Sequence, residues 1–261
     1  MSVKWVVQNN LCSIVETGDN KRIEDICRKH GFGFEGVKVI PFSGIIPEFD
    51  FNVPTIPYGG TGWINNIYIK YPNHRGIFFN PESVFTNWLN KYKTLNYGAL
   101  ETTFGEVADA LYLDDDLLFI RPVSDQKEFS GGVMLFKDIK QWRDKIITDV
   151  IELKDLPIIV HEPYQLSHEW RAFVLSGKVI TGSQYRTYHV LNTKAGLPQD
   201  VLEFVEEQAK IYSPAEVFVM DVCKTAGELY VLEVGCFNSA GFYESDLERI
   251  VCEVSNYVEK L

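Results

Sequence analysis

The chain has 261 residues, of which 46% are hydrophobic and 23% charged, enough apolar material for one large domain or two modest ones. A formal net charge of −11 argues against general nucleic-acid binding, because phosphate backbones need a basic surface. The five scattered cysteines argue against a zinc site or a disulfide framework and fit a reducing cytoplasm. No apolar run approaches the roughly 18 residues of a membrane span. We therefore expect a cytoplasmic protein that does not bind membranes.

Residues 1–94 predict a small N-terminal α/β unit. Strands are expected over residues 3–7 and 37–41, on either side of an amphipathic helix over 20–30. The elements expected after this β-α-β start are loops over the Pro- and Gly-rich residues 42–62, a strand over 64–70 and an amphipathic helix over 82–93.

Residues 95–261 predict a second domain. Two β-hairpins frame a helix that opens with a proline, and an amphipathic helix ends the chain. The predicted elements, in chain order, are strands over 116–122 and 158–163, a hairpin over 169–186, a helix over 198–212, a hairpin over 216–235 and a helix over 247–261.

Both hairpins carry charged residues at strand positions that are ordinarily apolar. Arg171 and Arg186 lie in the first hairpin, and Arg171 shares a strand face with Glu169, which would orient it on a non-core face. An exposed salt bridge between Glu169 and Arg171 is the alternative interpretation. Rigidly held guanidinium groups are well suited to phosphate, which they bind bidentately.

Asp221 and Glu233 lie in the second hairpin, each after an apolar run. A symmetric register about a turn near Ala226-Gly227 would pair odd with odd positions and bring the two carboxylates together. Neighbouring carboxylates repel unless a cation or a proton holds them, and a divalent ion with oxygen ligands would do so. Asn238 follows and offers a neutral oxygen. The alternative is that one carboxylate pairs with a lysine while the other faces water.

Arg121 ends a predicted strand, and Lys127 lies in the loop that follows it. A guanidinium binds phosphate bidentately, whereas an ammonium group acts as a mobile point charge. The small residues of the FSGG segment after Lys127 would let the backbone approach a ligand. Together with the hairpin residues, these cations predict a site for a polyphosphate carried with a divalent metal.

In this order the motifs resemble those of ATP-grasp proteins, and more narrowly the divergent clade named for its two arginines and one lysine. That clade includes a eukaryotic cell-division-cycle factor that helps assemble a translation initiation factor, and bacterial and phage proteins. The matching segments are FIRP with Arg121, Lys127 before FSGG, EWRAFV with Arg171, GSQYR, VFVMDV with Asp221, and LEVGCFNSAGFY with Glu233 and Asn238. The resemblance implies an ATP-grasp fold of two α+β subdomains with ATP between them, preceded by the small N-terminal unit.

The resemblance also implies where ATP would bind. Arg121 and Lys127 would contact its phosphates or its adenosine side. Val160, His161 and Glu162, at the end of a predicted strand, would lie beside the adenine base.

The catalytic cations implied by the resemblance are Arg171 and Arg186, which would face the γ-phosphate or an acyl phosphate. Asp221, Glu233 and Asn238 match the magnesium ligands of the family. In many relatives the last acid and the asparagine are two residues apart, whereas here four residues separate Glu233 from Asn238.

The implied activity is that of an ATP- and Mg²⁺-dependent carboxylate–amine ligase that forms an acyl phosphate and releases ADP and phosphate. Its carboxylate and amine substrates would be a peptide, a protein or a small amino acid. Two alternatives stay open. One is a non-catalytic ATP-binding module that assists assembly. The other is a nucleic-acid ligase or end-modifying enzyme, although the negative net charge of the chain argues against it. ADP release, tight ATP binding without turnover, and AMP release would distinguish the three.

Overall fold

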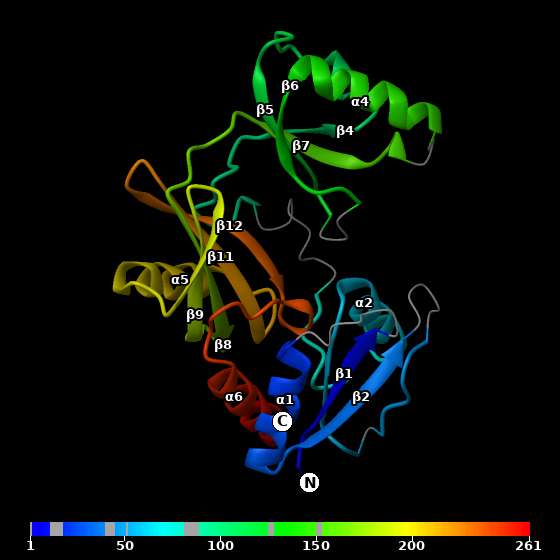
Figure 1. Ribbon diagram of the computed structural model, residues 1–261, viewed down its shortest axis with the longest axis vertical. Helices are drawn as coiled ribbons and strands as arrows, with labels where there is room; N and C mark the ends of the chain where they lie inside the picture. The colour runs from blue at the N-terminus through cyan, green and yellow to red at the C-terminus, as the bar shows by residue number, and fades with distance from the viewer. Residues whose placement is uncertain are drawn as a thin grey trace.

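The computed structural model describes residues 2–10, 18–39, 45–50, 52–80, 89–124, 128–149 and 153–261. Three β-sheets follow one another along the long axis of the molecule (Figure 1). The strands of the first sheet are parallel, and those of the other two are antiparallel. The fold is therefore a mixed α+β fold, as the sequence predicts.

The N-terminal sheet has the strand order β2-β1-β3, and its β-α-β start is confirmed. Its elements are β1 (Lys4–Asn10), α1 (Gly18–His30), β2 (Gly33–Val39), β3 (Thr55–Tyr58) and α2 (Thr61–Lys70).

Two predictions for this unit are wrong. Strand β3 lies in the segment expected to form loops, and residues 64–70 belong to helix α2 rather than to a strand. The buried residues of α2 are Trp63, Ile64 and Ile67, a helical spacing that the alternation within residues 64–70 obscures. Most of the helix expected over 82–93 lies outside the described residues.

The four-stranded sheet has the order β4-β7-β5-β6, and helix α4 covers one face (Figure 1). Alternation along β5 places Leu118 and Ile120 in the core under α4, which leaves Phe119 and Arg121 on the opposite face. The elements are β4 (Leu100–Thr103), η1 (Val107–Asp109), β5 (Leu117–Pro122), β6 (Gly132–Leu135), α4 (Phe136–Asp149) and β7 (Pro157–His161).

The five-stranded sheet has the order β10-β9-β8-β11-β12 and contains both predicted hairpins. Their turns, Ser176-Gly177 and Ala226-Gly227, have positive φ at both residues, as two-residue hairpin turns of type I′ require. The elements are β8 (His168–Leu175), β9 (Lys178–Thr187), β10 (Val190–Ala195), α5 (Gln199–Ile211), β11 (Val217–Thr225), β12 (Glu228–Cys236), η3 (Phe237–Ser239) and α6 (Leu247–Lys260).

Both faces of the five-stranded sheet are buried along its strands β8 and β11. Trp170 and Val174 on one face of β8 pack with residues of α5, whereas Phe173 on the other face joins the core formed with α6. Arg171 shares the Phe173 face, so it does not lie on a non-core face as the sequence predicts. The Arg171 side chain is only 16% exposed and therefore needs a fixed partner, because an unpaired buried charge is strongly unfavourable.

The N-terminal sheet and the last helix share one hydrophobic core. The indole Nε1 of Trp5 in β1 donates to Ser255 Oγ in α6 at 2.9 Å, and the Val3 amide donates to Glu259 Oε1 at 2.9 Å. Helices α1 and α6 lie side by side (Figure 1). The division of the chain between residues 94 and 95 stays a prediction. None of the described helices is long and apolar enough to cross a membrane.

Candidate functional site

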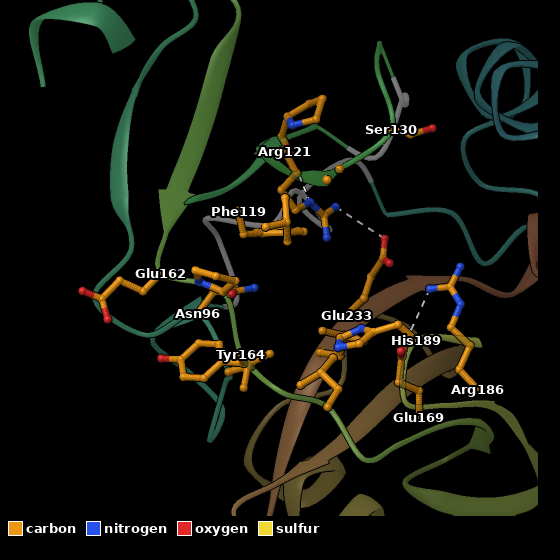
Figure 2. Close-up of a pocket in the computed structure, with 18 of the residues that line it drawn as sticks. Asn96, Phe119, Arg121, Ser130, Glu162, Tyr164, Glu169, Arg186, His189 and Glu233 are labelled. Carbon is orange, nitrogen blue, oxygen red and sulfur yellow. Dashed lines mark hydrogen bonds and ion pairs between the residues drawn. The ribbon is translucent and has the colours of Figure 1, made fainter. Parts of the chain in front are cut away.

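A cavity of about 480 Å³ lies between the four-stranded and five-stranded sheets, within the usual size of a small-molecule site. The cavity has two different ends (Figure 2). Arg121, Arg186 and Glu233 gather at one end, and Glu162 and Tyr164, from the segment after β7, lie at the other. The apolar lining consists of Leu95, Phe119, Pro122, Phe129, Val133, Pro163, Leu166 and Leu232.

Two ion pairs form the charged end of the cavity. Arg121 in β5 faces Glu233 in β12 across the space between the sheets, with Nη2 and Oε1 3.6 Å apart. Arg186 in β9 lies 3.6 Å, Nη1 to Oε2, from Glu169 in β8, which is only 2% exposed. The sequence predicts that Glu169 orients Arg171, whereas the structure pairs Glu169 with Arg186. Guanidinium groups at the wall of a cavity can bind an anionic ligand.

A β-bulge sets the position of Glu233. The turn pairs Thr225 with Glu228, an odd with an even position, but the register shifts between Val222 and Asp221, which lies opposite Glu233. Asp221 and Glu233 are therefore partners, as predicted, but through a bulge rather than a symmetric register. Leu232 is the extra residue on β12, and both Leu232 and Glu233 line the cavity. A bulge redirects side chains in this way, and bulges are frequent beside active sites.

Asp221 is bound by Arg171 rather than left to repel Glu233. Arg171 Nε and Nη2 donate to the two carboxylate oxygens of Asp221, each at 2.8 Å. Burial raises the pKa of the Asp221 carboxyl, and the Arg171 guanidinium opposes that rise. Burial also disfavours the charge on Arg171, but Asp221 outweighs this and raises the pKa of the guanidinium. We conclude that both groups are charged.

Aromatic side chains enclose this pair. The Arg171 guanidinium lies 5.2 Å from the centroid of the Tyr243 ring, which stacks on Tyr185, and Arg171 Nη1 donates to the Gly241 carbonyl at 3.2 Å. Neither Arg171 nor Asp221 lines the cavity. Their contact with it is indirect, through the register partner of Asp221, Glu233.

Asn238 is not brought to the cavity. Its side chain is fully buried, with Nδ2 donating to the Pro57 and Gly76 carbonyls at 2.7 and 3.0 Å and Oδ1 accepting from the Phe78 amide at 2.8 Å. These bonds join η3 to β3 and to the chain after α2. The role of metal ligand stays a prediction for Asn238, and it would require these bonds to break.

The three residues expected beside adenine do not lie together at the cavity. Glu162 lines the cavity, but Val160 is fully buried in the core under α4. His161 is turned to Tyr164, whose hydroxyl lies 3.0 Å from His161 Nε2. Lys127 lies outside the described residues.

Two residues that line the cavity, His189 and Asn96, are not identified by any pattern in the sequence. His189 follows Tyr188 in the turn between β9 and β10, and both turn residues have positive φ. This conformation is costly for non-glycine residues and is common near functional sites. His189 lines the charged end of the cavity (Figure 2). Asn96, in the segment before β4, lines the other end. Both His189 and Asn96 are single loop residues, so no periodicity or motif identifies them.

The carboxylates at and beside the cavity suit Mg²⁺ better than they suit a metal ion whose ligands all come from the protein. The described residues contain no group of three or more His, Cys, Asp or Glu placed to hold a metal ion. Mg²⁺ is usually bound by one or two carboxylates together with water and substrate phosphates. Glu233, supported by Asp221, meets that requirement.

The model of one protein family matches residues 62–254. It describes the ATP-grasp domain of family 3 in the clade named for two arginines and one lysine. No curated protein matches the chain in sequence.

Three similar solved structures agree with this fold over nearly the whole length of both chains. D-cycloserine synthetase DcsG has a TM-score of 0.64 at 10% identity and covers 98% of this chain and 99% of its own. The ATP-grasp ligase PsnB, complexed with precursor peptide PsnA2 and AMPPNP, has a TM-score of 0.58 at 13% identity, with 98% and 97% covered. D-alanine–D-alanine ligase from Bacillus anthracis, complexed with ATP, has a TM-score of 0.56 at 14% identity, with 100% and 99% covered. At these identities the likeness concerns the fold alone.

Asp221→Asn and Glu233→Gln should differ in their effect on the ligand-free protein. Asp221→Asn leaves the buried Arg171 guanidinium without its counter-charge, so we expect the free energy of unfolding to fall by about 3 kcal/mol. Glu233 is more exposed, at 30%, and its ion pair is long, so Glu233→Gln should cost less than about 1 kcal/mol. Urea unfolding of both variants measures the difference. Equal losses would contradict the distinct environments of the two carboxylates.

Asn238→Ala should destabilise the protein in the absence of any metal or nucleotide. It leaves the Phe78 amide and the Pro57 and Gly76 carbonyls without their partner, so we expect a loss of about 3 kcal/mol. Asn73→Ala, at an exposed position, is the control. Unchanged thermal stability of Asn238→Ala, combined with weaker Mg²⁺ binding, would favour the metal-ligand role instead.

Proposed function

This chain belongs to family 3 of the two-arginine, one-lysine clade of ATP-grasp domains and has the fold of ATP-grasp ligases. On that premise we propose that it is an ATP- and Mg²⁺-dependent carboxylate–amine ligase. The observation that carries the proposal is that Arg121 and Glu233 face each other across one cavity from separate sheets. A guanidinium and a carboxylate in that arrangement suit a phosphate chain and the cation it carries.

The charged end of the cavity contains the residues that we assign to phosphoryl transfer. Arg121 and Arg186 would bind phosphate oxygens, and Glu233, whose register partner is Asp221, would hold Mg²⁺. A Mg²⁺ ion held there would neutralise charge that develops on the transferred phosphoryl group. Arg171 positions Asp221 through its bidentate pair. A direct contact of Arg171 with phosphate, which the resemblance to the family implies, would require Arg171 to exchange Asp221 for the phosphate.

The proposed reaction has two steps. A substrate carboxylate oxygen attacks the γ-phosphorus of ATP, so that an acyl phosphate forms and ADP leaves. An amine nitrogen then attacks the acyl carbon, and phosphate leaves with the loss of a proton from nitrogen. No protein nucleophile is required, and the side chains bind charge and fix geometry. The precursor peptide bound in one similar structure, and the D-alanine–D-alanine ligase in another, support a peptide, a protein or an amino acid as substrate.

A second candidate function is that of an ATP-binding module without ligase turnover. The observation that favours it is that, of the three predicted metal ligands, only Glu233 lines the cavity. Asp221 is paired with Arg171, and Asn238 is bound to backbone groups. Release of ADP separates the two functions. The cytoplasmic location expected from the sequence stays a prediction.

Hydroxylamine should intercept the acyl phosphate if the ligase proposal is right. Protein, ATP, Mg²⁺ and hydroxylamine, incubated with a panel of amino acids, peptides and cell extract, should yield a hydroxamate and an equivalent amount of ADP, detected by mass spectrometry. The Arg121→Ala variant should reduce both products together, because it removes a phosphate-binding cation. Tight ATP binding with neither product across the panel would leave the non-catalytic module as the better account.

Glu233→Gln should weaken the Mg²⁺-dependent part of ATP binding. We expect the affinity for ATP with Mg²⁺ to fall by about tenfold, which corresponds to about 1.4 kcal/mol, while ATP without Mg²⁺ binds as in the wild type. Isothermal titration with and without Mg²⁺ measures both affinities. Glu228→Gln, the same substitution at the exposed start of β12, is the matched control. An equal loss with and without Mg²⁺ would exclude Glu233 as a metal ligand.

A further inference from the structure

Asn96 is a buried polar residue at the end of the cavity away from the ion pairs (Figure 2). It is 4% exposed, and its side-chain amide forms no hydrogen bond with the part of the chain that the structure describes. The amide atoms of Asn96 are not among the fully buried, unpartnered side-chain atoms of the described residues, so the small exposed part of this residue includes its amide at the wall of the cavity. A cavity-lining amide without a protein partner can exchange its bond to water for a bond to a ligand group.

The backbone on both sides of Asn96 is fixed. Before it, the Leu95 amide donates to the Val231 carbonyl at 3.0 Å and the Val231 amide donates to the Lys93 carbonyl at 2.8 Å, which adds this segment to the edge of β12. After it, the Ala99 amide donates to the Asn96 carbonyl at 3.0 Å across a turn. A side chain on a backbone held in this way is pre-organised for binding.

The surroundings of Asn96 suit a flat, neutral ring rather than a phosphate. Leu95, Leu166 and Leu232 line the cavity, and Tyr164 lies at the same end as Asn96 (Figure 2). The guanidinium groups of Arg121 and Arg186, which phosphates require, are at the opposite end. A nucleoside triphosphate that places its phosphates among the arginines therefore places its base beside Asn96.

We propose that Asn96 recognises the edge of the adenine base, with Oδ1 accepting from the 6-amino group and Nδ2 donating to the adjacent ring nitrogen. A side-chain amide matches the neighbouring donor and acceptor of adenine in this bidentate way. The inference deepens the proposed function and rests on it, because it requires ATP in this cavity. It assigns base recognition to the segment before β4, which pairs with the edge of β12.

The test combines a ligand change with a side-chain change. Binding of ATP and of purine riboside triphosphate, which lacks the 6-amino group, is measured by isothermal titration with Mg²⁺ for the wild type, Asn96→Leu and the exposed control Asn73→Leu. In the wild type and the control, removing the amino group should weaken binding by about tenfold. In Asn96→Leu the two nucleotides should bind equally. Leu at this position faces an apolar lining, so the ligand-free variant should melt no lower than the wild type.

The outcomes separate this inference from the proposed function. If Asn96→Leu still discriminates between the two nucleotides as the wild type does, Asn96 does not read the 6-amino group, and ATP binding itself stands. Equal binding of both nucleotides by the wild type would also overturn the inference alone. If the wild type binds neither nucleotide, the proposed function fails and the inference fails with it. Should Asn96→Leu melt far below the wild type, Asn96→Ser gives the same comparison with a smaller polar side chain.

Discussion

The candidate site depends on one extra residue in β12. Leu232 makes the bulge opposite Asp221, and as a result both Leu232 and Glu233 line the cavity. In a regular strand these neighbours would point to opposite faces, and the cavity would lose either its apolar wall or its carboxylate. The same shift brings Glu233 opposite Asp221. The carboxylate at the charged end of the cavity therefore lies next to the Arg171–Asp221 ion pair within the sheet.

Charge in this site is arranged in two layers. The inner layer is the Arg171–Asp221 pair, bidentate and enclosed by Tyr185 and Tyr243. The outer layer consists of long ion pairs at the cavity wall, each with a distance of 3.6 Å. Tight bidentate pairs fix geometry, whereas loose, partly hydrated pairs are easily exchanged for a ligand. The inner layer therefore holds the strands in place, and the outer layer is the part available to substrate.

The sequence predicts the elements with strong local signals and misses those that depend on tertiary context. The sequence predicts both hairpins, because the two-residue alternation of apolar residues on each side indicates strands and the residues Ser176-Gly177 and Ala226-Gly227 are suited to a tight turn. Helix α2 is missed because the alternation within residues 64–70 obscures its helical spacing. Of the site, Arg121, Arg186 and Glu233 are predicted from charge on strands and lie in the cavity, whereas Asn96 and His189 are single loop residues placed by contacts far away in the chain. The metal-ligand role of Asn238 stays a prediction, because the sequence does not distinguish an amide that binds backbone groups, as Asn238 does, from one that binds metal.

The contact between β1 and α6 has a consequence for synthesis of the chain on the ribosome. Trp5 lies in one core with Ile23 of α1, Ile56 of β3 and residues of α6, and its indole donates to Ser255. Trp5 and Ser255 are 250 residues apart, so this core is complete only when the last helix has been made, and contacts of such long sequence separation form slowly. A nascent chain of this protein would therefore carry an incomplete core around the VKWVV strand until α6 emerges, and truncation before Leu247 would remove α6 from that core.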